Sequence, residues 1–198
     1  MNRRNEINDS LGLMTIMENL SKRRRIFHSE ADFQFALAWE IQKEYPQAEV
    51  RLEYPSVYGS AKRIDIVVWH KGNVYPIELK YPKRNLSIDL DGEQYILKSS
   101  EASDNEKYAL VKDIVRMESF SSHLKGYKQG YVICLTNDHA YWMPPTDEVA
   151  GYAAFNVYEG ARKAGIMAWG SRAGAGTRKG QEAELVLKGE YDIHWNDY

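Results

Sequence analysis

The sequence has one cysteine, no long apolar run and almost no net charge, and each of these scarcities excludes a class of protein. Cys134 is the only cysteine among 198 residues, so the chain forms no internal disulfide and no cysteine-rich zinc site. No apolar run approaches the ~18 residues that a membrane-spanning helix needs. A net charge of −2 provides no general positive field for holding nucleic acid, so any such contact requires a local basic groove.

The first apolar residues of the chain are spaced for a helix and not for a secretion signal. Four of them share one helical face: Leu11, Met14, Met17 and Leu20. Glu18 and Asn19 interrupt the run, which a signal peptide would keep apolar. We therefore expect a cytoplasmic protein with no membrane span. The basic segment 21–25, SKRRR, is either a solvated helix end or a phosphate contact.

A second helix is marked at both of its ends. Ser29, followed three residues later by Asp32, forms a capping-box pattern with aspartate in place of the usual glutamate. A stripe at helical spacing follows: Phe33, Ala36, Leu37, Trp39, Glu40 and Ile41. The helix should stop before Tyr45-Pro46, because proline disfavours helical backbone in the preceding residue. Glu30 falls in the first turn, where the helix dipole alone explains a carboxylate.

Apolar segments beyond this helix predict a sheet. Strand patterns occur in five places: 49–54, 63–69, 74–80, 94–98 and 131–136. The segment 131–136 is almost continuously apolar, a composition typical of a central strand. The short strand at 94–98 interrupts a long polar loop, and a helix follows from Tyr108 to near Lys125. The order helix, three strands, helix, strand indicates a mixed α/β fold.

The chain divides into three parts that we expect to form one domain. Residues 1–25 are an N-terminal helical extension, and residues 26–140 hold the α/β core. Residues 141–198 add accessory strands, a glycine-rich loop at 170–180 and a hairpin that turns at Lys188-Gly189.

The stretch RIDIVVWHKGNVYPIELKY, residues 63–81, places charges inside two apolar strands. A tight turn at Lys71-Gly72 would align the strands in one register. The facing pairs on one side would all be apolar: Ile64–Leu79, Ile66–Ile77 and Val68–Tyr75. On the other side, Asp65 would face Glu78, and Arg63 would face Lys80. A one-residue bulge would move Asp65 away from that partner position.

Two opposed carboxylates have a chemical consequence. Directly facing side chains have Cβ atoms about 4.5–5.5 Å apart, and like charges there destabilise the sheet. At about 4 Å, two unit charges repel by roughly 1 kcal/mol in water and by roughly 4 kcal/mol at an effective dielectric near 20. A divalent cation between Asp65 and Glu78 would turn this repulsion into binding, and oxygen ligands suit Mg²⁺ or Mn²⁺. Lys80 shares their face and could orient or deprotonate a water, or stabilise charge on phosphorus.

A helix with an early glutamate, an aspartate on a strand and Glu-x-Lys on the next strand resemble the PD-(D/E)XK nuclease superfamily. The matching pieces are Glu30 in FHSEADF, Asp65 in RID, and Glu78 with Lys80 in IELK, and they cover about residues 27–137. Isoleucine, not proline, precedes the aspartate. The whole chain is also similar to a group of bacterial proteins of unassigned activity in that superfamily, through its HSEADF, DGE, KDIVR and AWG-RAGAGT stretches.

The resemblance implies a restriction-endonuclease-like core, a mixed central sheet flanked by helices in the order αβββαβ, with a C-terminal β-hairpin extension. It implies that Asp65, Glu78 and the backbone carbonyl of Leu79 bind Mg²⁺ or Mn²⁺. It assigns Lys80 to the attacking water and Glu30 to an accessory metal contact. The reaction would be metal-assisted hydrolysis of phosphodiester bonds, in DNA ahead of RNA.

Three interpretations of the sequence stay open. The first is a metal-dependent nuclease, possible as a homodimer because many nucleases of this superfamily pair to cut both strands. The second is an inactive protein of the same fold that binds nucleic acid or a protein partner, and the third is an unrelated α/β domain. Candidates for phosphate binding are basic residues that a solvated face also explains: Lys98, Lys112 and Arg116.

Overall fold

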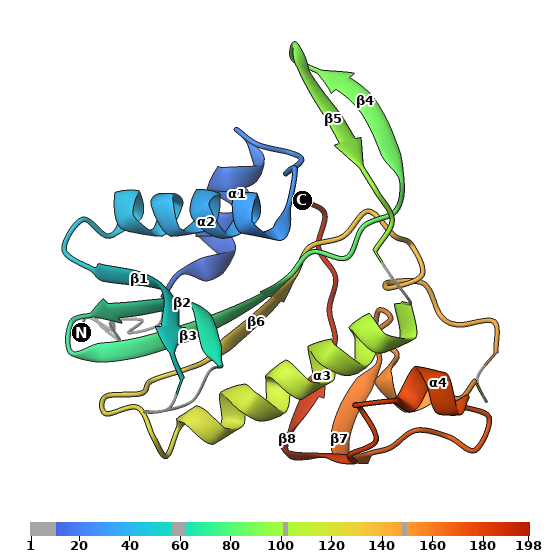
Figure 1. The fold of residues 1–198 in the computed structure, drawn as a ribbon. Helices are drawn as coiled ribbons and strands as arrows, with labels where there is room; N and C mark the ends of the chain where they lie inside the picture. Colours follow the sequence, from blue (N-terminus) through green and yellow to red (C-terminus); the bar gives the residue numbers. More distant parts are fainter. Residues whose placement is uncertain (1–10, 57–61, 101–102, 148–149) are drawn as a thin grey trace, which may run out of the picture.

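A mixed four-stranded sheet organises the computed structural model, which describes residues 11–56, 62–100, 103–147 and 150–198 (Figure 1). Its strands, in spatial order, are β1 (Glu49–Pro55), β2 (Arg63–His70), β3 (Asn73–Lys80) and β6 (Tyr131–Cys134). The pairs β1–β2 and β2–β3 are antiparallel, and β6 runs parallel to β3. The predicted mixed α/β class is therefore confirmed.

Helices cover both faces of this sheet, which explains why its middle strands are apolar on both sides. The helices α1 (Leu13–Ser21) and α2 (Glu30–Glu44) lie on one face, and α3 (Ser103–Phe120) lies on the other (Figure 1). Ile66 and Ile77 pack in the core beneath α1 and α2. Val67, Val74 and Met117 form a separate core cluster on the α3 side. Within the described residues, no helix combines the length and apolar character needed to cross a lipid bilayer.

The predicted cap of α2 is confirmed. In each predicted helical stripe, one residue expected to be buried is exposed. The Ser29 hydroxyl accepts a hydrogen bond from the Asp32 backbone N–H at 3.1 Å. Trp39 is 74% exposed, because it lies two residues, about 200°, from the buried Ile41. Met14 of α1 is exposed for the same reason, since the buried residue of that turn is Ile16.

The predicted hairpin register is confirmed from the turn as far as Ile66. Lys71 and Gly72 have φ of 49° and 78°, as a two-residue type I′ turn requires. Ladder pairs run from His70–Asn73 to Ile66–Ile77. The ladder ends there, before the level at which Asp65 would face Glu78.

Strand β6 lies at the edge of the sheet in the described part of the chain, so the prediction of a central strand was wrong. Its four residues are all partly exposed. Tyr131 and Ile133 pack against the core under α1 and α2, while Val132 and Cys134 pack on the opposite side. A continuous apolar run therefore indicates that both faces of a strand are covered. It does not indicate that the strand has a hydrogen-bonded neighbour on each side.

A β-hairpin occupies most of the predicted polar loop. Its strands are β4 (Leu86–Leu90) and β5 (Glu93–Leu97), and it projects away from the sheet in Figure 1. Asp91 and Gly92 form the turn, with φ of 56° and 82°. The prediction of a loop before residue 94 was wrong, although Asp-Gly is a strong hairpin signal.

The C-terminal part forms a second ribbon on the far side of α3 (Figure 1). It consists of β7 (Arg162–Met167) and β8 (Leu185–Asp192), preceded by the 3-10 helix η1 (Ala153–Phe155). The short helix α4 (Ala175–Arg178) lies inside the predicted glycine-rich loop.

The predicted turn at Lys188-Gly189 was wrong, because these residues form a bulge inside β8. Ala164 pairs with Glu190 and Gly165 pairs with Leu187, which leaves Lys188 and Gly189 without partners in the ladder. The Glu118 carboxylate of α3 accepts their backbone N–H groups instead, at 3.0 Å and 2.7 Å. It also accepts a hydrogen bond from the Tyr191 hydroxyl at 2.8 Å. Glu118 thus fixes the ribbon to α3.

Replacing Glu118 with alanine is expected to lower the free energy of unfolding by about 1–3 kcal/mol at pH 7. Burial raises the pKa of Glu118, but the hydrogen bonds from Lys188 and Gly189 outweigh it and lower the pKa below its usual value. The stabilisation is therefore present above the unfolded pKa and lost as pH falls through the folded pKa.

Urea unfolding at pH 7 and near pH 3 measures this loss. A matched control is Glu49→Ala, which removes an exposed carboxylate paired only at the surface with Arg51. A Glu118→Ala effect that is no larger than the control, or that stays constant at acid pH, would contradict the anchoring role.

Candidate active site

The β1–β2 pairing is interrupted at Glu53 and Asp65. These residues lie at the same level of the two strands but do not form a ladder pair. The ladder pairs on either side are Leu52–Ile66 and Tyr54–Ile64. The first pair packs in the core under α1 and α2, and the second packs in the cluster on the α3 side. Pairs two residues apart would share one face of a regular ribbon, so the backbone rotates between them. The prediction that Ile64 shares a face with Ile66 was therefore wrong.

Asp65 reaches across to the neighbouring strand. Its Oδ2 accepts a hydrogen bond from the Leu79 backbone N–H at 2.6 Å, beyond the last β2–β3 ladder pair. Burial raises the pKa of Asp65, more than the Leu79 N–H and nearby Lys80 lower it. The negative charge of Asp65 in turn raises the pKa of Glu78. The charges of the two carboxylates therefore influence each other, although the residues are not a ladder pair.

Glu78 is the most deeply buried acid of this group. It is 1% exposed, and its Oε2 forms an ion pair with the Arg116 guanidinium of α3. Its Oε1 has no hydrogen-bond partner among the described residues. Burial first, and then repulsion from Asp65, raise the pKa of Glu78 to about 9 despite Arg116. A buried oxygen without a partner is costly and indicates a missing ligand or proton.

Lys80 extends toward the same helix. Its Nζ lies 2.8 Å from Oδ2 of the buried Asp113 and donates to the Leu79 carbonyl at 3.2 Å. Burial lowers the pKa of Lys80, but the charges of Asp113, Glu30 and Asp65 outweigh it and raise the pKa. Lys80 is therefore an ammonium at neutral pH. This favours charge stabilisation or orientation of water over proton abstraction.

Strand and helix hold each other through reciprocal charges. Glu78 and Lys80 project from β3, and Asp113 and Arg116, three residues apart on α3, oppose them with the reverse order of sign. Arg116 also lies 3.5 Å from Asp113. We call these four residues the β3–α3 clamp. Sequence reasoning missed Asp113, although it lies one turn before Arg116 in the KDIVR stretch.

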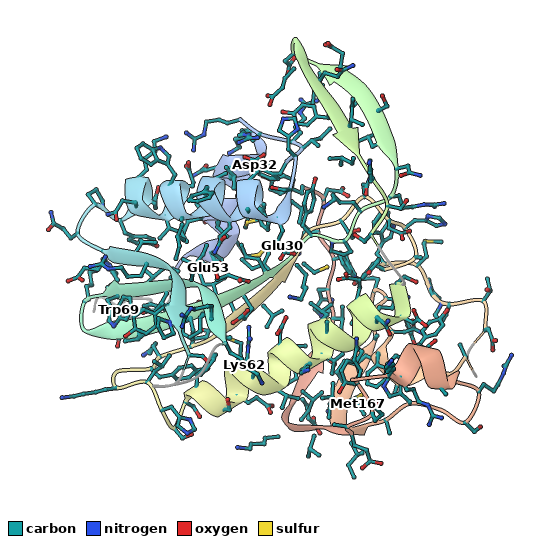
Figure 2. All side chains as sticks on the ribbon, viewed as in Figure 1. Glu30, Asp32, Glu53, Lys62, Trp69 and Met167 are labelled. Carbon is teal, nitrogen blue, oxygen red and sulfur yellow. The ribbon has the colours of Figure 1, made fainter. Side chains whose placement is uncertain are left out.

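Glu30 joins the start of α2 to the end of β3. Its Oε2 accepts a hydrogen bond from the Tyr81 backbone N–H at 2.8 Å. The residue is exposed, yet burial of its carboxylate raises the pKa more than Lys80 and the Tyr81 N–H lower it. Figure 2 labels Glu30 at the start of α2 and Glu53 on β1.

The three predicted phosphate-binding residues differ in their surroundings and exposure. Arg116 lies inside the clamp, with a side chain that is 23% exposed. Lys98 and Lys112 are exposed and lie outside the clamp. The Nζ of Lys112 lies 5.8 Å from the centroid of the Tyr108 ring. Of these three predicted residues, Lys98 and Lys112 are the ones that present a basic group directly to the solvent.

The formal charges of this region favour a cation. Carboxylates outnumber cationic groups, five to two: Glu30, Glu53, Asp65, Glu78 and Asp113 against Lys80 and Arg116. Among the described residues, no three His, Cys, Asp or Glu side chains converge as a complete metal-binding group. Mg²⁺ can bind through as few as one or two carboxylates and keep several waters, so the cation site expected at Asp65, Glu78 and the Leu79 carbonyl stays a prediction.

The larger cavities lie away from these charges. Three cavities of about 420, 440 and 470 Å³ follow β6 and the C-terminal segment, and the described residues that line them do not include Asp65, Glu78 or Lys80. Within the charged group, Glu30 and Glu53 are the exposed acids, whereas Asp65 is partly buried and Glu78 is buried.

Comparisons with protein families, curated proteins and solved structures found no match. The function of the charged group therefore has to be inferred from its own geometry, and the resemblance to the PD-(D/E)XK superfamily stays a prediction.

Proposed function

We propose that the protein is a Mg²⁺- or Mn²⁺-dependent nuclease that hydrolyses phosphodiester bonds in DNA. The observation that carries the proposal is the convergence of Asp65, Glu78 and Lys80 from adjacent strands, with Glu78 Oε1 buried and unpartnered among the described residues. The element order α2, β1, β2, β3, α3, β6, with β6 parallel to β3, supports a restriction-endonuclease-like core.

Each residue of the site has a defined part in this proposal. Asp65, Glu78 and the Leu79 carbonyl would hold the cation, which when bound activates water and neutralises charge on the phosphate. Lys80, kept protonated by Asp113, stabilises negative charge that develops on the scissile phosphate. Arg116 keeps Glu78 in place through Oε2 and leaves Oε1 for the cation. Lys98 and Lys112 are proposed contacts to the DNA backbone.

The ion pair between Arg116 and Glu78 favours a second candidate function. Arg116 already supplies positive charge to a glutamate that is 1% exposed, as a bound cation would. A chain that kept the fold and lost catalysis could use this arrangement to maintain its structure. It would then bind nucleic acid or a protein partner without cutting.

Incubation with supercoiled plasmid tests the two candidates. The nuclease is expected to convert plasmid to nicked or linear forms with Mg²⁺ or Mn²⁺ and to leave it intact with EDTA. The inactive alternative predicts no cleavage with either cation and, if nucleic acid is its partner, a gel shift that weakens as salt increases. Cleavage that persists in EDTA would contradict metal-dependent catalysis.

A further inference from the structure

Glu53 has a backbone conformation that its position in a strand does not require. Its φ is 50°, in the left-handed region that residues other than glycine rarely adopt. The described residues include two other such cases, Lys71 and Asp91, and each begins a tight turn followed by glycine. Glu53 alone lies inside a strand. Strain of this kind persists where the surrounding structure holds it, and it is frequent at functional sites.

A buried glutamine fixes the Glu53 side chain beside Asp65. The Nε2 of Gln34, a residue of α2 that is 7% exposed, donates to Glu53 Oε1 at 2.9 Å. The same Nε2 donates to the Asp65 backbone carbonyl at 2.7 Å. The charge of Glu53 adds to burial in raising the pKa of Asp65. Glu53 is exposed, whereas Asp65 is partly buried.

We propose that Glu53 is a further functional residue of the cation site, where its carboxylate binds the water shell of the cation next to Asp65. The inference rests on the proposed function. It explains why two residues, Glu53 and Asp65, leave the ladder together and why Gln34 ties them to each other. Glu78 is 1% exposed, and its Oε1, which has no hydrogen-bond partner among the described residues, accommodates either a proton or a ligand. Mg²⁺ and Mn²⁺ keep waters that such a carboxylate can accept.

Titration calorimetry with Mn²⁺ on the full chain, in about 0.15 M salt to screen distant charges, tests this role. Glu53→Gln keeps the side-chain length and an acceptor for Gln34 but removes the charge. Outer-shell partners of a metal typically contribute 10–100-fold to its affinity, so we expect Mn²⁺ binding about 10-fold weaker. Asp91→Asn is the matched control, an exposed acid with the same left-handed backbone at the β4–β5 turn, and should bind like the wild type.

A charge-retaining variant separates charge from structure. Glu53→Asp is expected to bind Mn²⁺ several-fold more tightly than Glu53→Gln, and this comparison holds even if Glu53→Gln unfolds at a lower temperature. Equal affinities of the wild type and Glu53→Gln would overturn the role of Glu53, as would a Glu53→Asp variant as weak as Glu53→Gln. In either case, loss of binding in Asp65→Asn would leave the proposed function in place. Failure of the wild type to bind Mn²⁺ would overturn both.

Discussion

Replacing Lys80 with methionine is expected to lower the rate of Mg²⁺-dependent plasmid cleavage by about 10²–10³-fold, the usual effect of removing one charge-stabilising donor. Methionine keeps most of the length of the side chain, and Arg116 remains beside both Asp113 and Glu78, so the packing between β3 and α3 should survive. What disappears is the ammonium that Asp113 holds at 2.8 Å. Time courses of plasmid nicking at saturating Mg²⁺ measure the change.

Measuring Mn²⁺ affinity distinguishes the role of Lys80 from that of the carboxylates. Lys80→Met is expected to bind Mn²⁺ at least as tightly as the wild type, because it removes a positive charge near the site. Asp65→Asn is expected to lose binding and cleavage together. The control is Lys125→Met, an exposed lysine beyond the end of α3, which should leave the rate unchanged. Wild-type cleavage by Lys80→Met would remove Lys80 from the mechanism.

Replacing Glu78 with glutamine is expected to stabilise the cation-free protein, and the gain should grow with pH. The folded pKa of Glu78 is about 9, whereas an unfolded glutamate has a pKa of about 4.3. Between these values the folded state keeps a proton that the unfolded state releases, so stability falls as pH rises. Glutamine carries no such penalty. We expect the difference to grow by up to about 1.4 kcal/mol for each pH unit between these two pKa values, and to be almost absent near pH 4.

Urea unfolding in EDTA across this pH range measures the difference, with Glu49→Gln as an exposed control that should show no such trend. Adding Mn²⁺ should then stabilise the wild type and have little effect on Glu78→Gln, because a ligand stabilises only the form that binds it. A gain that does not change with pH would show that Glu78 is ionised in the folded protein. A variant that gains stability and loses cleavage would mark Glu78 as a residue kept for function.

The parts of the site that could be predicted from the sequence are those set by local rules. Lys71-Gly72 fixes a two-residue turn, and the turn fixes the register as far as Ile66–Ile77. Ser29 and Asp32 fix the start of α2, and with it the place of Glu30. Each of these follows from residues close together in the chain.

The remaining parts depend on contacts between distant segments. Asp113 enters the site only because α3 packs beside β3, and nothing within α3 distinguishes it from a solvated acid. Glu53 lies in an alternating strand, and its left-handed backbone has no sequence signal. Lys188-Gly189 was read as a turn because glycine marks both turns and bulges, and only the pairing with β7 decides between them.

Helix α3 contacts the sheet on one side and the β7–β8 ribbon on the other through charged side chains. Arg116 and Glu118 are two residues apart, about 200° around the helix, and therefore point to opposite sides. Arg116 forms an ion pair with Glu78 of β3, and Glu118 accepts hydrogen bonds from the β7–β8 ribbon. Displacing the ribbon relative to the sheet would therefore require breaking the hydrogen bonds of Glu118 or the ion pair between Arg116 and Glu78.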